Sequence, residues 1–329
     1  MRLVLPMAGL GTRLRPHTWS KPKPLVPVAG KTVLGHFLDP VIALPDLEEA
    51  IFIVGYLGDQ IREYMGEYYP DLSVRYVVQE ELSGQSHAIW LAREGLAGPT
   101  LIGFVDTLIE TDFVVPSDEA AIWVREVDDP RRFGVAEVNA EAQVQNLIEK
   151  PEKPESNLAV VGFYYFEKAE RLITAIQQQL ESGSKLKGEY FLADAINVML
   201  DEGLSMRAVP VHAWNDCGTQ DALLETNHYL LDHGRDNTEA AVAGNGVVIE
   251  PPVFLDPSAQ VSRSVVGPYV SIGADCVIER SSIRESVIDA GSQIHDSKVY
   301  DSLIGRGCHV SDSDGSFNIG DASQVMGNG

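Results

Sequence analysis

Two glycines and four cations stand close together near the start of the chain. Gly9 and Gly11 follow an apolar run, Leu3 to Met7, that predicts a buried strand. Backbone amides can converge on an anion where glycines leave no side chain in the way. Four basic residues follow within a dozen positions: Arg13, Arg15, Lys21 and Lys23. The combination predicts a loop that binds a polyphosphate through neutral donors and full positive charge.

Two commoner glycine motifs do not fit this loop. The dinucleotide fingerprint needs a third glycine three positions after the second, where this chain has Leu14. The P-loop ends in Gly-Lys followed by Ser or Thr, and Thr12-Arg13 does not provide that ending. A simple turn remains an alternative, because pairs of glycines are common in turns.

The longer stretch AGLGTRLRPHTWSKPK resembles the signature of the sugar nucleotidyltransferases, the NDP-sugar pyrophosphorylases. The positions that match are Gly9, Gly11, Thr12, Arg13, Leu14, Pro16, Thr18, Pro22 and Lys23. The resemblance implies that Arg13 and Lys23 are catalytic and hold a nucleoside triphosphate. It also implies a set of loop residues that bind the nucleotide: Ala8, Gly9, Gly11 and Thr12.

Composition restricts the possible partners. The 329 residues carry 48 acidic and 25 basic side chains, so a net charge of −23 disfavours nucleic acid and membrane surfaces. Three distant cysteines without CxxC spacing indicate neither a zinc site nor a disulfide framework. The first predicted strand begins at residue 2, leaving no room for a signal peptide, and no apolar stretch is long enough to span a membrane. We therefore expect a cytoplasmic globular protein.

Residues 1–235 show the alternation of strands and helices that is typical of an α/β domain. Short β-branched segments near residues 2–7, 50–54, 74–78 and 100–104 are separated by helical stretches such as 33–43 and 85–95. We expect a Rossmann-like, mixed but mainly parallel sheet with ligands at the carboxyl ends of its strands. Later strands near residues 120–127, 134–138, 144–149 and 159–166, with helices at 167–179, 191–201 and 220–231, would build the sugar side.

A different pattern follows a polar linker at residues 236–246. Apolar residues recur every five or six positions in residues 247–329, at Val261, Val266, Ile272, Ile278, Ile283, Ile288, Ile294, Val299 and Ile304, followed after a break by Ile319. This is the hexapeptide repeat of a left-handed parallel β-helix, with room for four or so coils. A β-sandwich is the alternative, but its strands should alternate with period two. Since a β-helix has exposed ends, we expect this domain to form a homo-oligomer.

Two aspartates each end a predicted strand and could bind a metal. Asp106 closes LIGFVD and Asp216 closes AVPVHAWND. Mg²⁺ is typically held by one or two carboxylates together with phosphate oxygens of a substrate. A turn or cap role is the alternative for each aspartate. In the family, one metal aspartate lies in a W-x-D-x-G-T motif, which Trp214, Asp216, Gly218 and Thr219 match; at the other site Val105 replaces the usual glycine.

The run EKPEKPESNLAVVGFYYF looks like the sugar-phosphate segment of the family. The resemblance implies that Lys150 holds the phosphate of the sugar. It also implies a group of residues that shape the sugar pocket: Gly134, Glu149, Val160, Gly162 and Glu189. A solvated Glu-Lys pair is the alternative for Glu149 and Lys150, and a helix-start role is the alternative for Glu189.

Gln79 matches the position that contacts the base in the family, and Gly84 would leave room for the ring. A glutamine amide can both donate to and accept from uracil or thymine, and after rotation it can serve cytosine. The residue therefore favours a pyrimidine without deciding which one. A buried structural glutamine remains the alternative.

Together these features predict transfer of a nucleotidyl group from dTTP or UTP to a sugar 1-phosphate, glucose 1-phosphate being favoured by resemblance to the long-type thymidylyltransferases. A UTP-specific enzyme and another sugar, such as mannose or an N-acetylhexosamine, stay open. A regulatory subunit that binds nucleotide sugars without turnover is an alternative of another class. His295 and His309 lie in the repeat domain but do not match the pattern of β-helix acyltransferases.

Overall fold

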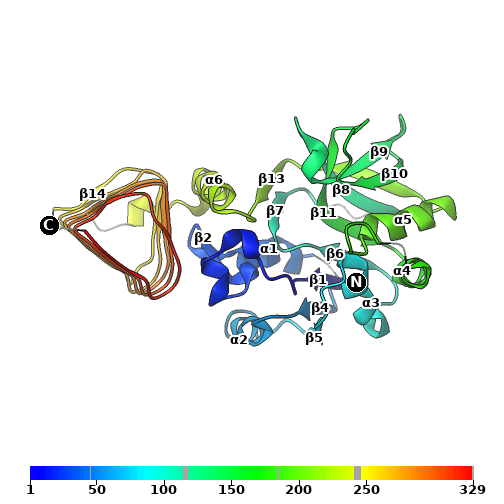
Figure 1. The fold of residues 1–329 in the computed structure, drawn as a ribbon, viewed down its shortest axis with the longest axis horizontal. Helices are drawn as coiled ribbons and strands as arrows, with labels where there is room; N and C mark the ends of the chain where they lie inside the picture. Colours follow the sequence, from blue (N-terminus) through cyan, green and yellow to red (C-terminus); the bar gives the residue numbers. More distant parts are fainter. Residues whose placement is uncertain (45, 114–117, 184, 241–245, 328–329) are drawn as a thin grey trace. The chain divides into compact units, whose positions relative to one another are not determined.

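A computed structural model describes residues 1–44, 46–113, 118–183, 185–240 and 246–327 of the chain. The chain divides into two compact units, which Figure 1 draws together. The first unit comprises Met1–Gly9 and Phe37–Trp214, and the second comprises Leu10–His36 and Asn215–Gly329. The domain limits at residues 235 and 247 stay a prediction, and residues 241–245 of the predicted linker lie outside the described residues.

A nine-stranded sheet organises the first unit (Figure 1). Its main order is β10-β9-β11-β6-β1-β4-β5, and β8 and β12 continue from β11. The strands are β1 Arg2–Pro6, β4 Glu49–Val54, β5 Val74–Val78, β6 Thr100–Gly103, β8 Ala120–Glu126, β9 Gly134–Val138, β10 Val144–Glu149, β11 Leu158–Phe166 and β12 Met206–Pro210.

The sheet is parallel on one side and largely antiparallel on the other. Strand β1 pairs in parallel with β4 and β6, and its residues Leu3, Val4 and Leu5 are fully buried. Burial on both faces explains why this strand is a continuous apolar run. Beyond β6, strand β11 pairs antiparallel with β6, β8 and β9. The mixed sheet predicted from the sequence is therefore confirmed.

Helices pack their apolar faces against this sheet. They are α2 Gly58–Tyr68, α3 Gln85–Leu91, α4 Ala169–Ser182 and α5 Leu192–Asp201. Leu172 and Ile176 of α4 join Ile196 of α5 in the buried core of the unit. Helix α4 runs three residues beyond its predicted end and stops where Gly183 adopts a left-handed conformation with φ of 68°.

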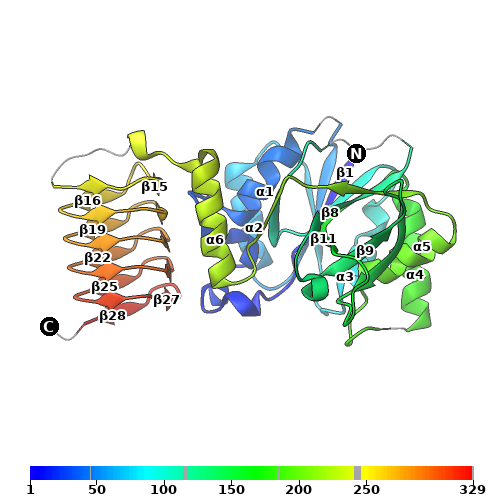
Figure 2. The ribbon, with the colours of Figure 1, turned by 90° about the horizontal axis from the view of Figure 1, so that it is seen from above.

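The second unit contains the β-helix, seen along its axis in Figure 1 and from the side in Figure 2. Three parallel sheets of five strands each form its walls. The strands are β14 Val248–Ile249, β15 Val253–Leu255, β16 Gln260–Ser262, β17 Val265–Val266, β18 Val270–Ile272, β19 Val277–Glu279, β20 Ser282–Ile283, β21 Ser286–Ile288, β22 Gln293–His295, β23 Lys298–Val299, β24 Ser302–Ile304, β25 His309–Ser311, β26 Asp314–Gly315, β27 Asn318–Ile319 and β28 Gln324–Met326.

The repeat prediction is confirmed, with five coils instead of about four. Ser282 pairs with Lys298, which pairs with Asp314, so a coil here takes 16 residues and more coils fit than expected. The predicted inward residues, such as Ile278, Ile294 and Ile304, are fully buried.

Stacked serines tie neighbouring coils together at one corner. The backbone amide of Ser281 donates to Oγ of Ser264 at 3.0 Å, and the same contact repeats from Ser297 to Ser281 and from Ser313 to Ser297 at 3.2 Å. Each hydroxyl thus satisfies a backbone donor that a buried corner would otherwise leave without a partner.

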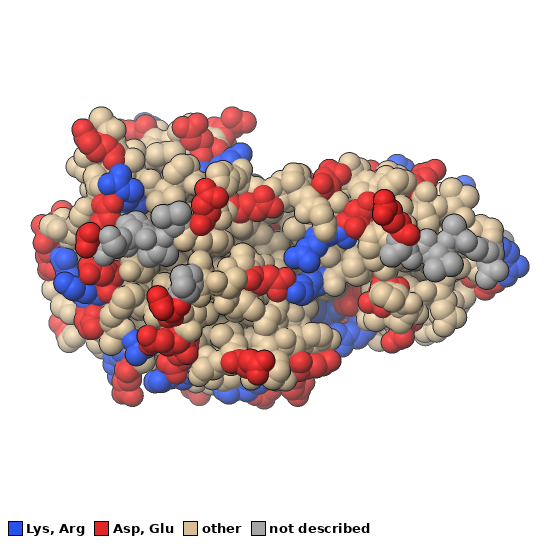
Figure 3. Space-filling model, turned by 180° about the vertical axis from the view of Figure 1, so that it is seen from behind, with Lys and Arg blue, Asp and Glu red and all other residues tan. Residues whose placement is uncertain are grey.

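Short elements make up the rest of the second unit and its borders. They are the 3-10 turns η1 Thr12–Leu14, η2 His17–Trp19, η3 Lys23–Leu25 and η7 Thr238–Ala240, the strands β2 Pro27–Val28 and β3 Lys31–Thr32, helices α1 Val33–Ile42 and α6 Gln220–Leu230, the π-turn η6 Leu231–Arg235, and strand β13 Ala213–Asp216. Among the described residues, no helix is both long and apolar enough to cross a bilayer. Figure 3 shows Asp and Glu spread widely over the face it draws, with Lys and Arg in smaller groups.

Candidate nucleotide and sugar-phosphate sites

The glycine loop begins with a tight turn in the second unit. Gly11 has a left-handed conformation with φ of 60°, and a Cβ there would lie 3.0 Å from Thr18 Cγ2 and 3.1 Å from Lys23 Cβ. Thr18 Oγ1 also donates to the carbonyl oxygen of Gly11 at 2.8 Å. The structure therefore brings Gly11, Thr18 and Lys23 of the signature together. Ala8 and Gly9 close the segment Met1–Gly9 of the first unit, where Ala8 is buried and Gly9 is exposed.

Arg13 and Asp216 both lie beside Gly218 at the start of α6. A Cβ on Gly218 would be 2.7 Å from Asp216 Oδ1 and 2.9 Å from Arg13 Nη2. Asp216 Oδ1 accepts a hydrogen bond of 2.7 Å from the amide of Gly218, and Thr219 caps α6 through its hydroxyl. The matched motif therefore places a carboxylate and a guanidinium around one glycine. Thr12 is exposed in the same loop.

Lys21 is not available to bind a phosphate. This corrects the expectation that all four basic residues of the loop bind a polyphosphate. Lys21 is only 4% exposed. Its ammonium donates to Asp289 Oδ2 and lies 3.2 Å from Asp321 Oδ1, both in the β-helix. Two carboxylates therefore already neutralise this lysine.

Asp106 lies in the turn between β6 and β7 (Thr107–Glu110) of the first unit and is partly exposed. The backbone beside it is fixed by strand β11. Gly162 has φ of 84° at an irregularity of β11, and its carbonyl accepts from the amide of Phe104 at 3.0 Å. Thr107 Oγ1 donates to the carbonyl of Val161 at 3.1 Å. The structure thus brings the predicted sugar residue Gly162 next to the Asp106 turn.

The two candidate metal ligands, Asp106 and Asp216, belong to different units. In the part of the chain that the structure describes, no three His, Cys, Asp or Glu side chains cluster as a metal site. A pair of carboxylates nevertheless suits Mg²⁺, which takes oxygen ligands and can complete its shell with substrate phosphates and water. The chemistry of each carboxylate is therefore compatible with the predicted ion, and a joint magnesium site of Asp106 and Asp216 stays a prediction.

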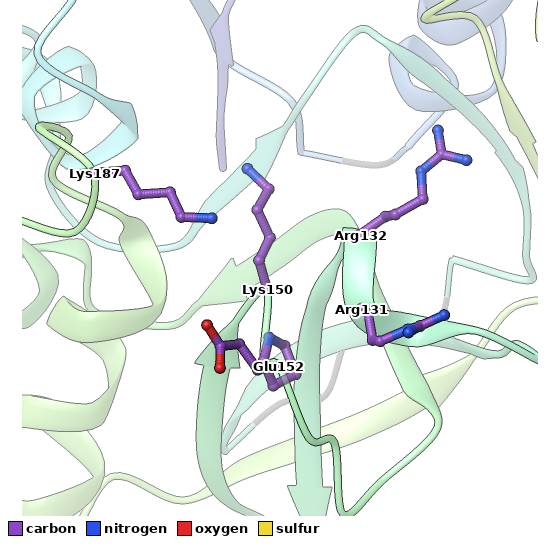
Figure 4. A pocket seen from close by; sticks show the side chains of 6 residues that line it. Arg131, Arg132, Lys150, Glu152 and Lys187 are labelled. Atoms are coloured by element: carbon purple, nitrogen blue, oxygen red, sulfur yellow. The ribbon is translucent and has the colours of Figure 1, made fainter.

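A cavity of about 580 Å³ surrounds Lys150 in the first unit (Figure 4). Its lining residues are Arg131, Arg132, Lys150, Pro151, Glu152 and Lys187. Four of these six are cations, although acidic residues outnumber basic ones almost two to one in the whole chain. In Figure 4, Lys187 extends toward Lys150 and Arg132 projects on the other side of it. This cavity is suited to an anion.

The cations of the cavity differ in whether a carboxylate already pairs with them. Asp129 accepts from Nε and Nη2 of Arg131, both at 2.7 Å, and these bonds lower the pKa of Asp129 to about 2. Lys150 Nζ lies 3.3 Å from Glu149 Oε1 and 5.0 Å from the ring centroid of Phe191. Neither Arg132 nor Lys187 forms an ion pair with any described residue. The positive charge of the cavity is therefore only partly neutralised.

Three of the five residues predicted to shape the sugar pocket lie together: Gly134, Glu149 and Val160. Gly134 and Glu149 pair directly between β9 and β10, and a Cβ on Gly134 would lie 3.1 Å from Glu149 Oε2 and 3.8 Å from Val160 Cβ. Burial raises the pKa of Glu149, and the charges of Asp194 and Glu189 add to this rise, whereas Lys150 opposes it. Glu189 itself is exposed just before α5.

Gln79 follows β5 and is 6% exposed. Its Nε2 lies 3.4 Å from the carbonyl oxygen of Gly84 and 3.3 Å from Nδ1 of His87. Gly84 has φ of 106°, and a Cβ there would approach the backbone of Tyr190 to 2.5 Å. The backbone therefore requires a glycine at position 84, whether or not that glycine also leaves room for a base.

Sequence reasoning missed Arg132, Lys187 and His87. Arg132 and Lys187 each stand two residues before a predicted sugar residue, Gly134 and Glu189. That adjacency was a usable signal, because an anionic substrate favours cations near the sugar positions. His87 follows Gln79 by eight residues, and only the return of the chain into α3 brings the two side chains together.

A mixed α/β sheet with a glycine turn after its first strand, a cation-rich cavity and a C-terminal left-handed β-helix defines the architecture of a nucleotide-sugar enzyme. The family model for nucleotidyl transferases matches residues 3–233, about two thirds of the chain, so the chain belongs to that family.

Curated relatives extend the similarity to almost the full length. A low-salt glycan biosynthesis nucleotidyltransferase of Haloferax volcanii, Agl11, is 32% identical and the match covers 95% of each chain. A glucose-1-phosphate thymidylyltransferase of Streptomyces griseus is 30% identical over 94% of this chain and 93% of its own. Among solved structures, a UDP-glucose pyrophosphorylase complexed with UDP-glucose superposes with a TM-score of 0.61 at 20% identity, over 70% of this chain and 98% of that one, and supports the fold alone.

Proposed function

We propose that this nucleotidyltransferase joins a nucleoside triphosphate, dTTP or UTP, to glucose 1-phosphate and releases pyrophosphate. The observation that carries the proposal is the cation-rich cavity around Lys150, whose ammonium lies 3.3 Å from Glu149 of the Gly134, Glu149 and Val160 group. A sugar phosphate needs a cationic place for its phosphate beside polar groups for its hydroxyls. The similarity to the glucose-1-phosphate thymidylyltransferase of Streptomyces griseus supports this choice of substrates.

The chemistry is a displacement at the α-phosphorus. A phosphate oxygen of the sugar 1-phosphate forms a new bond to that phosphorus, and the bond to the β-phosphate oxygen breaks with release of pyrophosphate. The nucleophile already carries negative charge near neutral pH, so the main barrier is the approach of two anions. Arg13 and Lys23 hold the triphosphate, and Lys150 orients the sugar phosphate, with Arg132 and Lys187 adding positive potential.

Asp106 and Asp216 are the residues that would hold Mg²⁺. When bound, this ion would neutralise phosphate charge during the transfer. The side chain of Asp216 already accepts a backbone hydrogen bond from Gly218, which orients its carboxylate. Replacing either residue by Asn should raise the magnesium concentration needed for half-maximal activity.

Gln79 carries the proposed preference for a pyrimidine. Its amide lies against Gly84 and His87, so its orientation is restrained on one side. A restrained amide can read the base by a paired donor and acceptor. His87 would act on the base only through this orientation of Gln79.

The test is pyrophosphate release with glucose 1-phosphate and Mg²⁺ against dTTP, UTP, CTP, ATP and GTP in parallel. We expect turnover with dTTP and UTP, and their ratio defines the nucleotide specificity. Turnover confined to a purine nucleotide would contradict the role of Gln79 while keeping the transfer chemistry. Mannose 1-phosphate and N-acetylglucosamine 1-phosphate serve as parallel sugar substrates, and inactivity with all of them would favour a regulatory subunit.

The β-helix is the proposed oligomerisation domain. Its last coil leaves Met326 76% exposed, and its first coil leaves Val248 52% exposed. Exposed strand edges with apolar side chains favour association of chains. Sedimentation analysis of the full-length protein measures the oligomeric state.

A further inference from the structure

One wall of the β-helix contacts the glycine-signature loop along most of its length. This wall is the sheet β15-β18-β21-β24-β27. In its first coil the ring of Phe254 fills the space beside Gly30, where a Cβ would approach to 2.4 Å. In its last coil Asn318 Oδ1 lies 2.7 Å from Nε2 of the buried His17, and Gly320 packs against Pro16. Residues 16–30 are therefore in contact with this wall at both ends.

Helix α6 reinforces the same contact through one buried amide. Asn227 is fully buried, and its Oδ1 accepts from the hydroxyl of Ser271 at 2.6 Å and from the amide of Ala29 at 3.2 Å. Its Nδ2 donates to the carbonyl of Tyr269 at 3.1 Å. One side chain thus links α6, the loop and the β-helix wall.

The charged centre of the contact is Lys21. Its ammonium pairs with Asp289, which follows β21, and with Asp321, which follows β27. Ser20 Oγ donates to the other carboxylate oxygen of Asp321 at 2.8 Å, and the amide of Arg306 donates to Oδ1 at 2.8 Å. The Arg306 contact therefore holds the Asp321 carboxylate in place from within the β-helix, independently of its contacts with Ser20 and Lys21.

A buried ion pair adds little net stability, because desolvation offsets much of its attraction, and fixing register is its best-attested role. The loop has two lysines separated only by Pro22, so it could in principle place either one against the β-helix. Asp289 and Asp321 take Lys21, and this choice sets the position of Lys23 two residues later. Lys23 in turn packs against Gly11, whose turn leads into Arg13.

We propose that Lys21 is a positioning residue through which Asp289 and Asp321 of the β-helix hold the triphosphate-binding loop in its active register. The proposal rests on the function proposed above for Arg13 and Lys23. The β-helix would then form part of the nucleotide site by a defined contact, in addition to any role in assembly.

The direct test is binding of inorganic triphosphate to the full-length protein by calorimetry, because this probe engages the loop without a base or a sugar. Asp321→Asn removes one charge and keeps the shape, and Asp289 still neutralises Lys21, so the fold should persist. We expect this variant to bind triphosphate about tenfold more weakly, since small displacements of binding groups carry effects of that order or larger. Its KM for the nucleoside triphosphate should rise, whereas its KM for the sugar phosphate should not change.

Two further variants separate positioning from general stability. Lys21→Arg keeps the charge and should retain triphosphate affinity within about threefold, whereas Lys21→Met should lose about tenfold or more. Asp314→Asn is the matched control, because it breaks an exposed ion pair of the same β-helix with Lys298. This control should leave triphosphate affinity and both KM values unchanged.

The outcomes distinguish this proposal from the proposed function. Asp321→Asn and Lys21→Met proteins that stay folded and bind triphosphate like the wild type would overturn the positioning role. A wild-type protein that binds triphosphate but releases no pyrophosphate with any sugar phosphate would contradict the proposed function, and the variant affinities would still decide the role of Lys21. Absence of triphosphate binding by the wild type would overturn the positioning role, and pyrophosphate release would still decide the proposed function.

Discussion

The two units of the molecule place lysine in opposite surroundings. Lys21, in the second unit, is buried and lies between two carboxylates of the β-helix. Lys150, in the first unit, is 42% exposed at its side chain and lines a cavity with three other cations. Both lysines belong to motifs rich in lysine and proline. The difference shows that neighbouring carboxylates, more than the motif, decide whether a cation holds the protein together or remains able to bind a ligand.

The largest effect expected from this comparison is on stability at Lys21. Lys21→Met keeps much of the side-chain volume but leaves Asp289 and Asp321 without their counter-ion. Removal of one partner from a buried ion pair typically costs about 3–5 kcal/mol in free energy of unfolding. Urea denaturation of the full-length protein measures this loss.

Lys298→Met is the matched control for that experiment. The Lys298–Asp314 pair has side chains 72% and 60% exposed and a distance of 3.4 Å. Exposed pairs contribute about 0–1 kcal/mol, so this variant should unfold almost like the wild type. Equal losses for the two variants would show that burial does not make the Lys21 ion pair more important for stability than an exposed one.

The next effect is on catalysis at Lys150. Lys150→Ala removes the cation that we propose orients the sugar phosphate, so the KM for this substrate should rise and turnover should fall. Loss of one such electrostatic contact reduces kcat/KM by about 100-fold, which corresponds to about 2.7 kcal/mol. Steady-state kinetics with varied sugar phosphate measures both parameters.

Lys153→Ala is the control in the same KPEKP run, because Lys153 is exposed and does not line the cavity. We expect its kinetic parameters to match those of the wild type. Unchanged kinetics of Lys150→Ala would remove Lys150 from the site, and the anion cavity would then need another explanation.

The contrast between the lysines also shows what the sequence could predict. Part of the surroundings of Lys150 was accessible, because Glu149 is its neighbour in sequence and pairs with Gly134 on the adjacent strand. The surroundings of Lys21 were not accessible, because Asp289 is 268 residues away and lies outside any motif shared with the loop. The inward residues of the β-helix were predictable for the opposite reason: their spacing repeats with each coil, so burial follows from the period alone.

Other features of the fold were likewise predictable where a local sequence pattern marks them. The strands β1, β4 and β6 were predictable as short segments rich in apolar and β-branched residues, whereas the short strand β7 carries no comparable signal. The coil number of the β-helix depended on the repeat length, and coils as short as 16 residues allow five coils instead of four or so. Local periodicity therefore predicted the elements, and contacts between distant residues completed them.

The smallest effect concerns Glu149, the carboxylate next to Lys150. Burial raises the pKa of Glu149 above its ordinary value of 4.5, so the folded protein binds this proton more tightly than the unfolded chain does. The ionised carboxylate therefore lowers the stability of the fold above the raised pKa, and this cost disappears as the pH falls toward 4.5. Glu149→Gln should accordingly be more stable than the wild type at neutral pH, with the difference shrinking in acid, while its KM for the sugar phosphate rises.

Urea denaturation of both proteins between pH 4 and pH 8 measures this difference directly. Glu152→Gln is the control, because Glu152 lines the same cavity but is exposed, and it should show no such pH-dependent gain. Glu149→Gln could instead be less stable than the wild type by the same amount at every pH. That result would mean that the contact with Lys150 stabilises the ionised carboxylate by more than burial destabilises it. Glu149 would then neutralise Lys150 much as Asp289 and Asp321 neutralise Lys21. The difference between the two lysines would be smaller than their surroundings indicate.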